Sequence, residues 1–441
     1  MRFTHTVFRA GHAVVRCALR RTAITAIMAV YVTGALMAAC STASLLDVVA
    51  PANVPVSRLN EPGNAVLMVH SAIGDFECAF GAAVSVEAII SDELADAQLG
   101  AAAWPYDRRD FNTQTNGAYG TGSCTDNQTP GIYAPLSTAR WSADHAVTNL
   151  TGWTDAQVPN RMALLAQANL YAGFSYATLG MAMCSAAFDL GPEVQQTGMF
   201  ALAEARFTAA ITAAQASSST NILRAAYVGR ARVRLFQGNK TGAAADAALV
   251  PVGFALNSSN DASDNRLYNR IYAITQQFGM YTIEANSRNL VTDRGEVDPR
   301  SAAKLVSTRP ADAKSPIWVP LKFAAGDAAP MPVARYEEAQ LILAEAQGGA
   351  SAVSIINALR TTEGLLSYTG ATDAASIQNL IIDERRRALF TEGFRNYDMQ
   401  RFNVALNPAA GAAYPLKGGT YGTTRCLPLP DVERFNNPNI K

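Results

Sequence analysis

Residues 380–395 read LIIDERRRALFTEGFR and form the strongest helical pattern in the C-terminal part of the chain. Apolar side chains that can face a core recur there at helical spacing: Leu380, Ile381, Leu389 and Phe390. Charged side chains between them are expected to stay in solvent: Asp383, Glu384, Arg385 and Arg387. We predict one helix over residues 376–402. Pairs at the i,i+3 spacing, Glu384 with Arg387 and Glu392 with Arg395, favour a structural interpretation of it.

Ala-rich amphipathic segments occupy residues 159–251 and 333–405, which we interpret as a helical-repeat scaffold. The second helix of a tetratricopeptide repeat carries a small, a large and again a small residue, because small residues let paired helices approach closely. Ala203, Phe207 and Ala210 have this pattern, and weaker units turn at Gly238-Asn239 and at Gly348-Gly349. The sequence therefore predicts a mainly α-helical fold of tetratricopeptide-like helix pairs.

Two long segments, residues 99–135 and 257–332, lack helical periodicity and are rich in Gly, Asn and Thr or Ser. Ordered loops of such length are usually functional. A helix is predicted before the first of them, over residues 64–95. His70 lies in its apolar run, so we expect a hydrogen-bonded core residue there. Asp92, Glu93 and Asp96 would share a solvent-facing side of the same helix.

The N-terminus resembles an export signal. Several arginines precede an uncharged stretch, residues 22–39, which ends in Ala38-Ala39 before Cys40. We expect a signal peptide over residues 1–39, lipidation of Cys40, a tether over residues 40–58 and a single domain over residues 59–441. The alternative is a retained membrane anchor, since the apolar stretch is nearly long enough to span a bilayer.

Four further cysteines follow that leader: Cys78, Cys124, Cys184 and Cys426. An even number in an oxidising compartment indicates two disulfides, and four cysteines allow three connectivities. We predict Cys78 with Cys124, which closes the first loop onto the preceding helix, and Cys184 with Cys426, which ties an early helix to the tail. Four buried free thiols are the alternative.

Catalytic and metal-binding motifs are scarce. The 36 basic and 36 acidic residues balance, which argues against a nucleic-acid binder. Only His70 and His145 remain after the leader, no His/Cys cluster has zinc-ligand spacing, and no Gly-x-Ser-x-Gly elbow occurs. Residues 260–264 offer oxygen ligands for calcium but lack the EF-hand pattern, so a solvated loop is favoured. The sequence predicts no enzyme, no cofactor and no metal site.

Aromatic and polar residues gather in the irregular segments. The candidate ligand-binding residues are Trp104, Tyr106, Arg108, Tyr119 and Trp318. Flat apolar rings beside polar groups suit sugars, which present C–H faces and hydroxyl edges. The alternative is that these rings pack against one another inside the long loops and form a local hydrophobic core rather than a ligand site.

Several short motifs follow one another in a fixed order: RYEEA at 335–339, NALR at 357–360, EGFR at 392–395, DMQR at 398–401 and LPLP at 427–430. With them the chain resembles the SusD/RagB family of nutrient-binding lipoproteins over nearly all its length after the leader. The resemblance implies four tetratricopeptide-like helix pairs with long ligand-binding loops. It also implies a lipoprotein on the outer face of the bacterial outer membrane, without catalytic activity.

The same resemblance implies a TonB-dependent, SusC-type barrel transporter as partner, and a glycan or, in some members, a peptide as ligand. One departure stands out: many members have an aromatic-Gly-Asp turn where this chain has residues 183–189, MCSAAFD. Two other classes stay open. A tetratricopeptide scaffold that binds only protein would not need the aromatic cluster, and a surface glycoside hydrolase would need two carboxylates in one cleft.

Overall fold

The computed structural model describes residues 56–111 and 117–440. Cys40 and the expected signal peptide lie outside these residues, as does nearly all of the tether. The chain divides into two units, residues 1–59 and 60–441. In the first, the structure describes the short helix α3 (Val56–Leu59). All further elements belong to the second unit.

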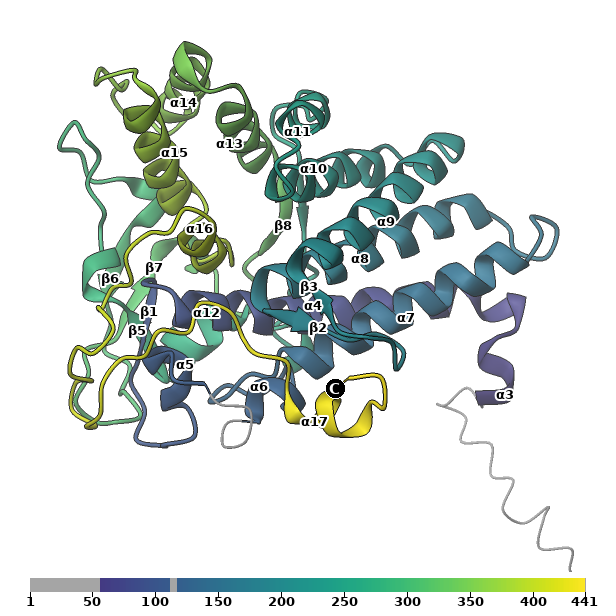
Figure 1. Cartoon of the computed structure of the whole chain (residues 1–441), viewed down its shortest axis with the longest axis horizontal. Coiled ribbons are helices and arrows are strands. Elements are labelled where there is room, and N and C mark those ends of the chain that lie inside the picture. Colours follow the sequence, from purple (N-terminus) through teal and green to yellow (C-terminus); the bar gives the residue numbers. More distant parts are fainter. Residues whose placement is uncertain (1–55, 112–116, 441) are drawn as a thin grey trace, which may run out of the picture. The chain divides into compact units, whose positions relative to one another are not determined.

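Helices dominate this unit, and neighbours in the sequence pack side by side. The long ones are α4 (Ala65–Ile90), α7 (Tyr133–Gly152), α8 (Arg161–Ala182), α9 (Gln196–Ala216), α10 (Thr220–Phe236) and α11 (Lys240–Ala247), then α13 (Tyr336–Gln347), α14 (Gly349–Thr362), α15 (Ala374–Ala388) and α16 (Arg395–Arg401). From α7 to α15 each helix of this series contacts the next, so they form one continuous row (Figure 1). The mainly α-helical prediction is confirmed.

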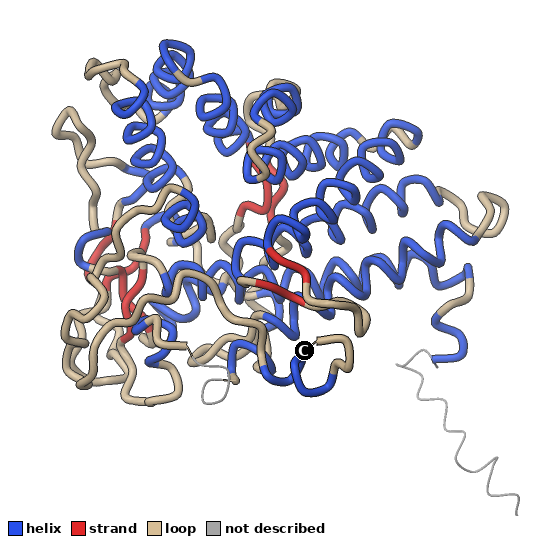
Figure 2. Tube along the Cα trace, in the orientation of Figure 1, coloured by secondary structure: helices blue, strands red, loops and turns tan. Residues whose placement is uncertain are grey.

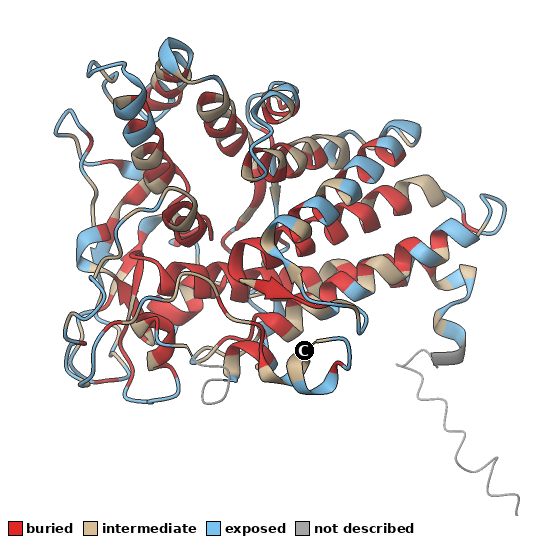
Figure 3. Cartoon of the chain, viewed as in Figure 1, coloured by how far each residue is buried: buried red, intermediate tan, exposed pale blue. Residues whose placement is uncertain are grey.

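Small and large residues interlock between these helices as the repeat pattern predicts. Phe207 of α9 is fully buried and its ring lies between α8 and α10. A Cβ atom on Gly173 or on Gly229 would come within 2.7 Å and 2.5 Å of that ring, so only glycine lets the helices approach so closely. Figure 3 shows that α4 and α8 are buried over much of their length, because each of them packs against several other helices.

Short strands join segments that lie far apart in the sequence. Four antiparallel pairs form: β1 (Leu94–Asp96) with β5 (Tyr281–Ile283), β2 (Ser185–Ala186) with β3 (Val194–Gln195), β4 (Ala255–Asn257) with β8 (Pro332–Arg335), and β6 (Ala303–Leu305) with β7 (Trp318–Pro320). Loops gather around β1, β5, β6 and β7 at one side of the unit (Figures 1 and 2). The two irregular segments of the sequence therefore meet there.

Short helices complete the chain within the loops. They are α5 (Trp104–Arg108), α6 (Ala118–Thr121), α12 (Arg270–Tyr272) and α17 (Asp431–Asn436), with single turns η1 (Pro62–Asn64), η2 (Asn265–Leu267), η3 (Ala273–Gln277), η4 (Ala285–Ser287), η5 (Pro299–Ser301) and η6 (Leu321–Phe323). The first loop region ends at residue 132 rather than 135, since α7 begins at Tyr133.

Three local predictions were wrong. The helix expected over residues 376–402 is broken between α15 and α16, where Thr391 and Gly393 have positive φ angles of 57° and 82°. The helix expected over residues 64–95 ends at Ile90, because the next residues turn into β1 and pair with β5. His70 is exposed rather than part of the core, because its side of α4 faces solvent together with Val66 and Leu67.

Three charged residues of the 380–395 segment are buried, whereas the local spacing predicts that they face solvent. Glu384, Arg385 and Arg387 are at most 5% exposed. Glu384 binds Arg300 and Arg360 from other elements, at 2.9 Å and 2.6 Å, rather than Arg387. This carboxylate therefore holds distant parts of the chain together.

Glu392 and Arg395 behave in the same way. Glu392 accepts from Lys322 and Arg335, at 2.5 Å and 2.9 Å, and Arg395 binds Asp92 at 2.7 Å. The segment therefore makes tertiary ion pairs rather than the local pairs that its spacing predicts, and its structural role stays a prediction.

Candidate functional site

The aromatic residues predicted to bind a ligand separate into buried and accessible ones. Tyr106 of α5 and Tyr119 of α6 are 1% and 0% exposed. Both rings pack edge-to-face against Phe111, at 5.3 Å and 5.5 Å between centroids. The Tyr106 hydroxyl donates to the Pro130 carbonyl, at 2.9 Å. These two tyrosines form the core of the first loop, which was the alternative interpretation.

Trp104 and Arg108 lie one turn apart on α5 and are half-buried. The Arg108 guanidinium is 5.0 Å from the ring centroids of both Trp104 and Tyr414. Its Nη2 donates to the Gly418 carbonyl at 3.0 Å. A planar cation between two rings leaves an accessible surface of mixed aromatic and polar character, which is suited to a polar ligand with apolar faces.

Charged side chains lie next to the stack formed by Trp104, Arg108 and Tyr414, on the side of the Tyr414 hydroxyl. The Tyr414 hydroxyl lies 3.1 Å from Asp107 Oδ2 and 3.3 Å from Asp96 Oδ2. The Lys417 ammonium binds Asp96 and lies 3.7 Å from Asp312. Burial raises the pKa of the Asp107 carboxyl to about 7. These charged groups join the C-terminal tail to α5 and β1.

Trp318, on β7, is a second accessible aromatic residue with an arginine over its ring. Its side chain is half-buried, and the Arg288 guanidinium lies 5.0 Å from its ring centroid. Its backbone N–H donates to the Thr282 hydroxyl of the neighbouring strand β5, at 2.9 Å. Because β5 also pairs with β1, Trp318 and α5 belong to the same side of the unit (Figure 1).

The carboxylates at the end of α4 are buried, which corrects the expected solvent-facing cluster. Asp92, Glu93 and Asp96 are 3%, 1% and 7% exposed. Asp92 and Asp96 are neutralised by Arg395 and Lys417. Burial raises the pKa of Glu93 to about 8, and its carboxylate accepts from the Thr391 N–H at 3.0 Å. These groups hold the fold together.

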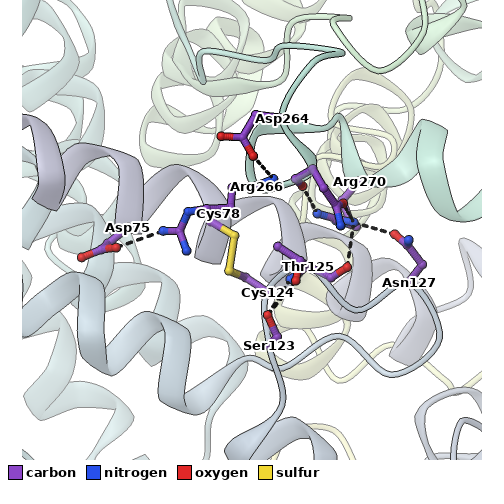
Figure 4. The surroundings of a disulfide bond; sticks show 10 residues. Asp75, Cys78, Ser123, Cys124, Thr125, Asn127, Asp264, Arg266 and Arg270 are labelled. Atoms are coloured by element: carbon purple, nitrogen blue, oxygen red, sulfur yellow. Dashed lines mark hydrogen bonds and ion pairs between the residues drawn. A yellow bond between two sulfur atoms is a disulfide. The ribbon is translucent and has the colours of Figure 1, made fainter. Parts of the chain in front are cut away.

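The chain contains the disulfides Cys78–Cys124 and Cys184–Cys426, which are the predicted pairs. The first fastens the loop that follows α6 to α4 (Figure 4). Beside it, Arg270 donates to Asn127 and to the Thr125 carbonyl of that loop, at 2.5 Å and 3.3 Å, and to the Asn265 carbonyl at 2.6 Å. One buried guanidinium therefore joins the two irregular segments.

A cleft of about 230 Å³, lined by both polar and apolar residues, opens next to this disulfide. Asp75 of α4 and Arg266 of η2 meet across it at 3.0 Å (Figure 4). Ser123 and Thr138 complete its polar lining. Asp264, considered above as part of a calcium loop, instead accepts from the Arg266 N–H at 2.9 Å. In the described residues no group of three His, Cys, Asp or Glu side chains is placed to hold a metal ion.

The predicted ligand face leaves out Trp141, an exposed tryptophan on a helix. Trp141 of α7 is 49% exposed and stacks on His145, with 4.8 Å between centroids and 8° between planes. The i,i+4 spacing of this pair is visible in the sequence, whereas the predicted ligand face consists of residues from the irregular segments. Across residues 56–111 and 117–440 there is no helix apolar and long enough to cross a bilayer.

Comparison with known proteins gives a family match over part of the chain and a fold for most of it. Residues 255–426 match the sequence model of the SusD family. No curated protein sequence is significantly similar. Among solved structures, a SusD superfamily protein from Bacteroides vulgatus is similar at a TM-score of 0.64, with 14% identity over 86% of this chain and 98% of its own.

Two further solved structures are of proteins named for their ligands. A laminarin binding SusD-like protein is 16% identical over 86% of this chain and 98% of its own, at a TM-score of 0.62. Surface glycan-binding protein A from Bacteroides fluxus is 13% identical over 85% of this chain and 96% of its own, at 0.63. Residues 255–426 thus match the SusD family, and the chain as a whole has the fold of solved SusD-like proteins.

Proposed function

We propose that the protein is a lipoprotein on the outer face of the bacterial outer membrane that binds oligosaccharides and delivers them to a TonB-dependent, SusC-type transporter. The observation that carries this proposal is the SusD family match over residues 255–426, on a chain that has the fold of solved SusD-like proteins. One of those proteins is described as binding laminarin, and another as a surface glycan-binding protein. The protein would bind and present its ligand without catalysis.

Within this proposal Trp104, Arg108 and Trp318 contact the sugar, and Tyr106 and Tyr119 support them from the loop core. The half-buried Trp104 ring offers an apolar face to the sugar. Beside it lies the Arg108 guanidinium, which the rings of Trp104 and Tyr414 hold in position. Such a site desolvates its ligand only in part, so modest affinity is expected. Peptide binding is the second candidate, since the same aromatic and arginine side chains would also accept a peptide.

The ligand experiment is calorimetric titration of soluble polysaccharides, laminarin included, and of mixed peptides. Trp104→Ala should weaken glycan binding by on the order of 1–3 kcal/mol, if stacking on sugars resembles stacking on bases. Phe435→Ala, which removes an aromatic side chain that is 80% exposed on α17, is the control. Affinity for peptides over every polysaccharide would replace the proposal with its second candidate. Release of reducing ends would contradict the absence of catalysis.

Location and partner need separate experiments. Cys40→Ala should abolish labelling by a fatty-acid probe and release the protein from outer-membrane fractions. Labelling that persists in this variant would show that the lipid lies elsewhere. Purification of the lipidated protein from mild detergent should also recover a barrel of the SusC type. Recovery of the lipoprotein without any barrel would contradict the proposed partnership.

A further inference from the structure

The exposed face of α7 carries a row of residues that begins at the cleft beside the Cys78–Cys124 disulfide and continues along the helix. Thr138, Trp141, Ser142 and His145 are three or four positions apart, so they lie on one face of the helix. Thr138 lines the cleft, and the Ser142 hydroxyl donates to Asp75 Oδ2 at 2.9 Å. Trp141 therefore lies on α7 one turn from Thr138, which lines the cleft, and next to Ser142, which binds the cleft residue Asp75.

The Trp141 ring is held in place although half of it is exposed. It stacks in parallel on His145 at 4.8 Å. The Nε2 atom of His145 lies 2.7 Å from Asn60 Oδ1 and 3.1 Å from Asn149 Nδ2. A ring supported in this way loses little conformational freedom when a ligand covers its open face.

The polar groups of the cleft are equally well supported. Asp75 is shared by Ser142 and Arg266, whose side chain is 50% exposed and free to donate further hydrogen bonds to a ligand. The loop that carries Ser123 is fastened by the disulfide. It is also packed so tightly that a Cβ atom on Gly122 would lie 2.4 Å from the Ala118 carbonyl. The cleft thus exists before any ligand arrives.

We propose that Trp141 is the stacking residue of a sugar subsite whose hydroxyl-binding groups are Asp75, Ser123, Thr138 and Arg266. A pyranose ring has an apolar C–H face, which suits the indole, and equatorial hydroxyls that both donate and accept. The cleft supplies a carboxylate, a guanidinium and two hydroxyls for them. Because the two charges already neutralise each other, a neutral sugar fits better than a uronate or a sulfated one.

This inference rests on the proposed function, and its test separates the two. Laminarin and a set of neutral soluble polysaccharides are titrated calorimetrically against the wild type, Trp141→Ala, Trp141→Phe and the control Phe435→Ala. We expect Trp141→Ala to weaken binding on the order of 10- to 100-fold, while Trp141→Phe, which keeps an aromatic face, retains most of the affinity. Alanine favours the helix, so the melting temperature of Trp141→Ala should stay at the wild-type value.

Each outcome has a defined meaning. Wild-type binding that survives unchanged in Trp141→Ala overturns the subsite and leaves the proposed function standing. An equal loss in Phe435→Ala also overturns the subsite, since the effect would then not belong to this cleft. Failure of the wild type to bind every polysaccharide overturns the proposed function together with the subsite. Tighter binding of a sulfated polysaccharide than of a neutral one contradicts the assigned sugar class.

Discussion

Replacement of Glu384 by Gln tests the tertiary ion pairs most directly. The carboxylate is fully buried and accepts from Arg300 at 2.9 Å and from Arg360 at 2.6 Å. Burial alone lowers the pKa of the Arg360 guanidinium, but Glu384 and Asp293 together outweigh this effect and raise the pKa. Glutamine preserves the shape and removes the charge, so two buried cations would face a neutral amide.

The expected loss of unfolding free energy follows from these contacts. Each charge-assisted hydrogen bond is worth about 1.5–3 kcal/mol. Arg300 keeps Asp298 and Arg360 keeps Asp293 as partners, which limits the loss. We expect a decrease of about 3–5 kcal/mol, the usual result of breaking a buried pair.

Urea denaturation followed by circular dichroism measures this decrease. Glu363→Gln, the same exchange at an exposed position of the α14–α15 connection, is the control and should change the free energy by less than about 0.5 kcal/mol. Arg360→Met should reproduce the effect of Glu384→Gln. A Glu384→Gln variant within about 1 kcal/mol of the wild type would refute the reasoning.

Three further changes test other parts of the structure. Arg386→Ala removes hydrogen bonds of 2.9 Å to the Asn286 carbonyl and to the Ser287 hydroxyl, so we expect a stability loss of about 1–3 kcal/mol with unchanged glycan preference in calorimetry. The double change Cys78→Ser and Cys124→Ser should cost about 2–4 kcal/mol and speed proteolysis of the loop after α6, whereas an unchanged digestion pattern would show that the disulfide does not restrain it. Burial raises the pKa of the Glu87 carboxyl from 4.5 to about 8, so the folded state binds its proton more tightly than the unfolded state. The resulting stabilisation is complete below pH 4.5 and is lost as the pH rises through about 8. Glu87→Gln should therefore show a smaller fall in unfolding free energy over this range than the wild type, and parallel pH curves would contradict the assignment.

Much of the scaffold was predictable because its cause is local. Helical periodicity and the small–large–small pattern around Phe207 depend on residues within a few turns of one another, and the structure has these helices where the pattern puts them. The turn at Gly348-Gly349 is likewise present, with positive φ at both residues. The paired cysteines are those that close the first loop and tie down the tail.

The environment of individual side chains was decided only by the tertiary structure. Spacing paired Glu384 with Arg387, but an exposed helical pair contributes only about 0.2–0.5 kcal/mol. In a buried site the carboxylate needs several donors, and Arg300 and Arg360 reach it from elements that no local pattern connects. Likewise Tyr106 and Trp141 are both aromatic residues of helices. One is buried because a loop folds over it, and the other is exposed because nothing in the described residues covers it.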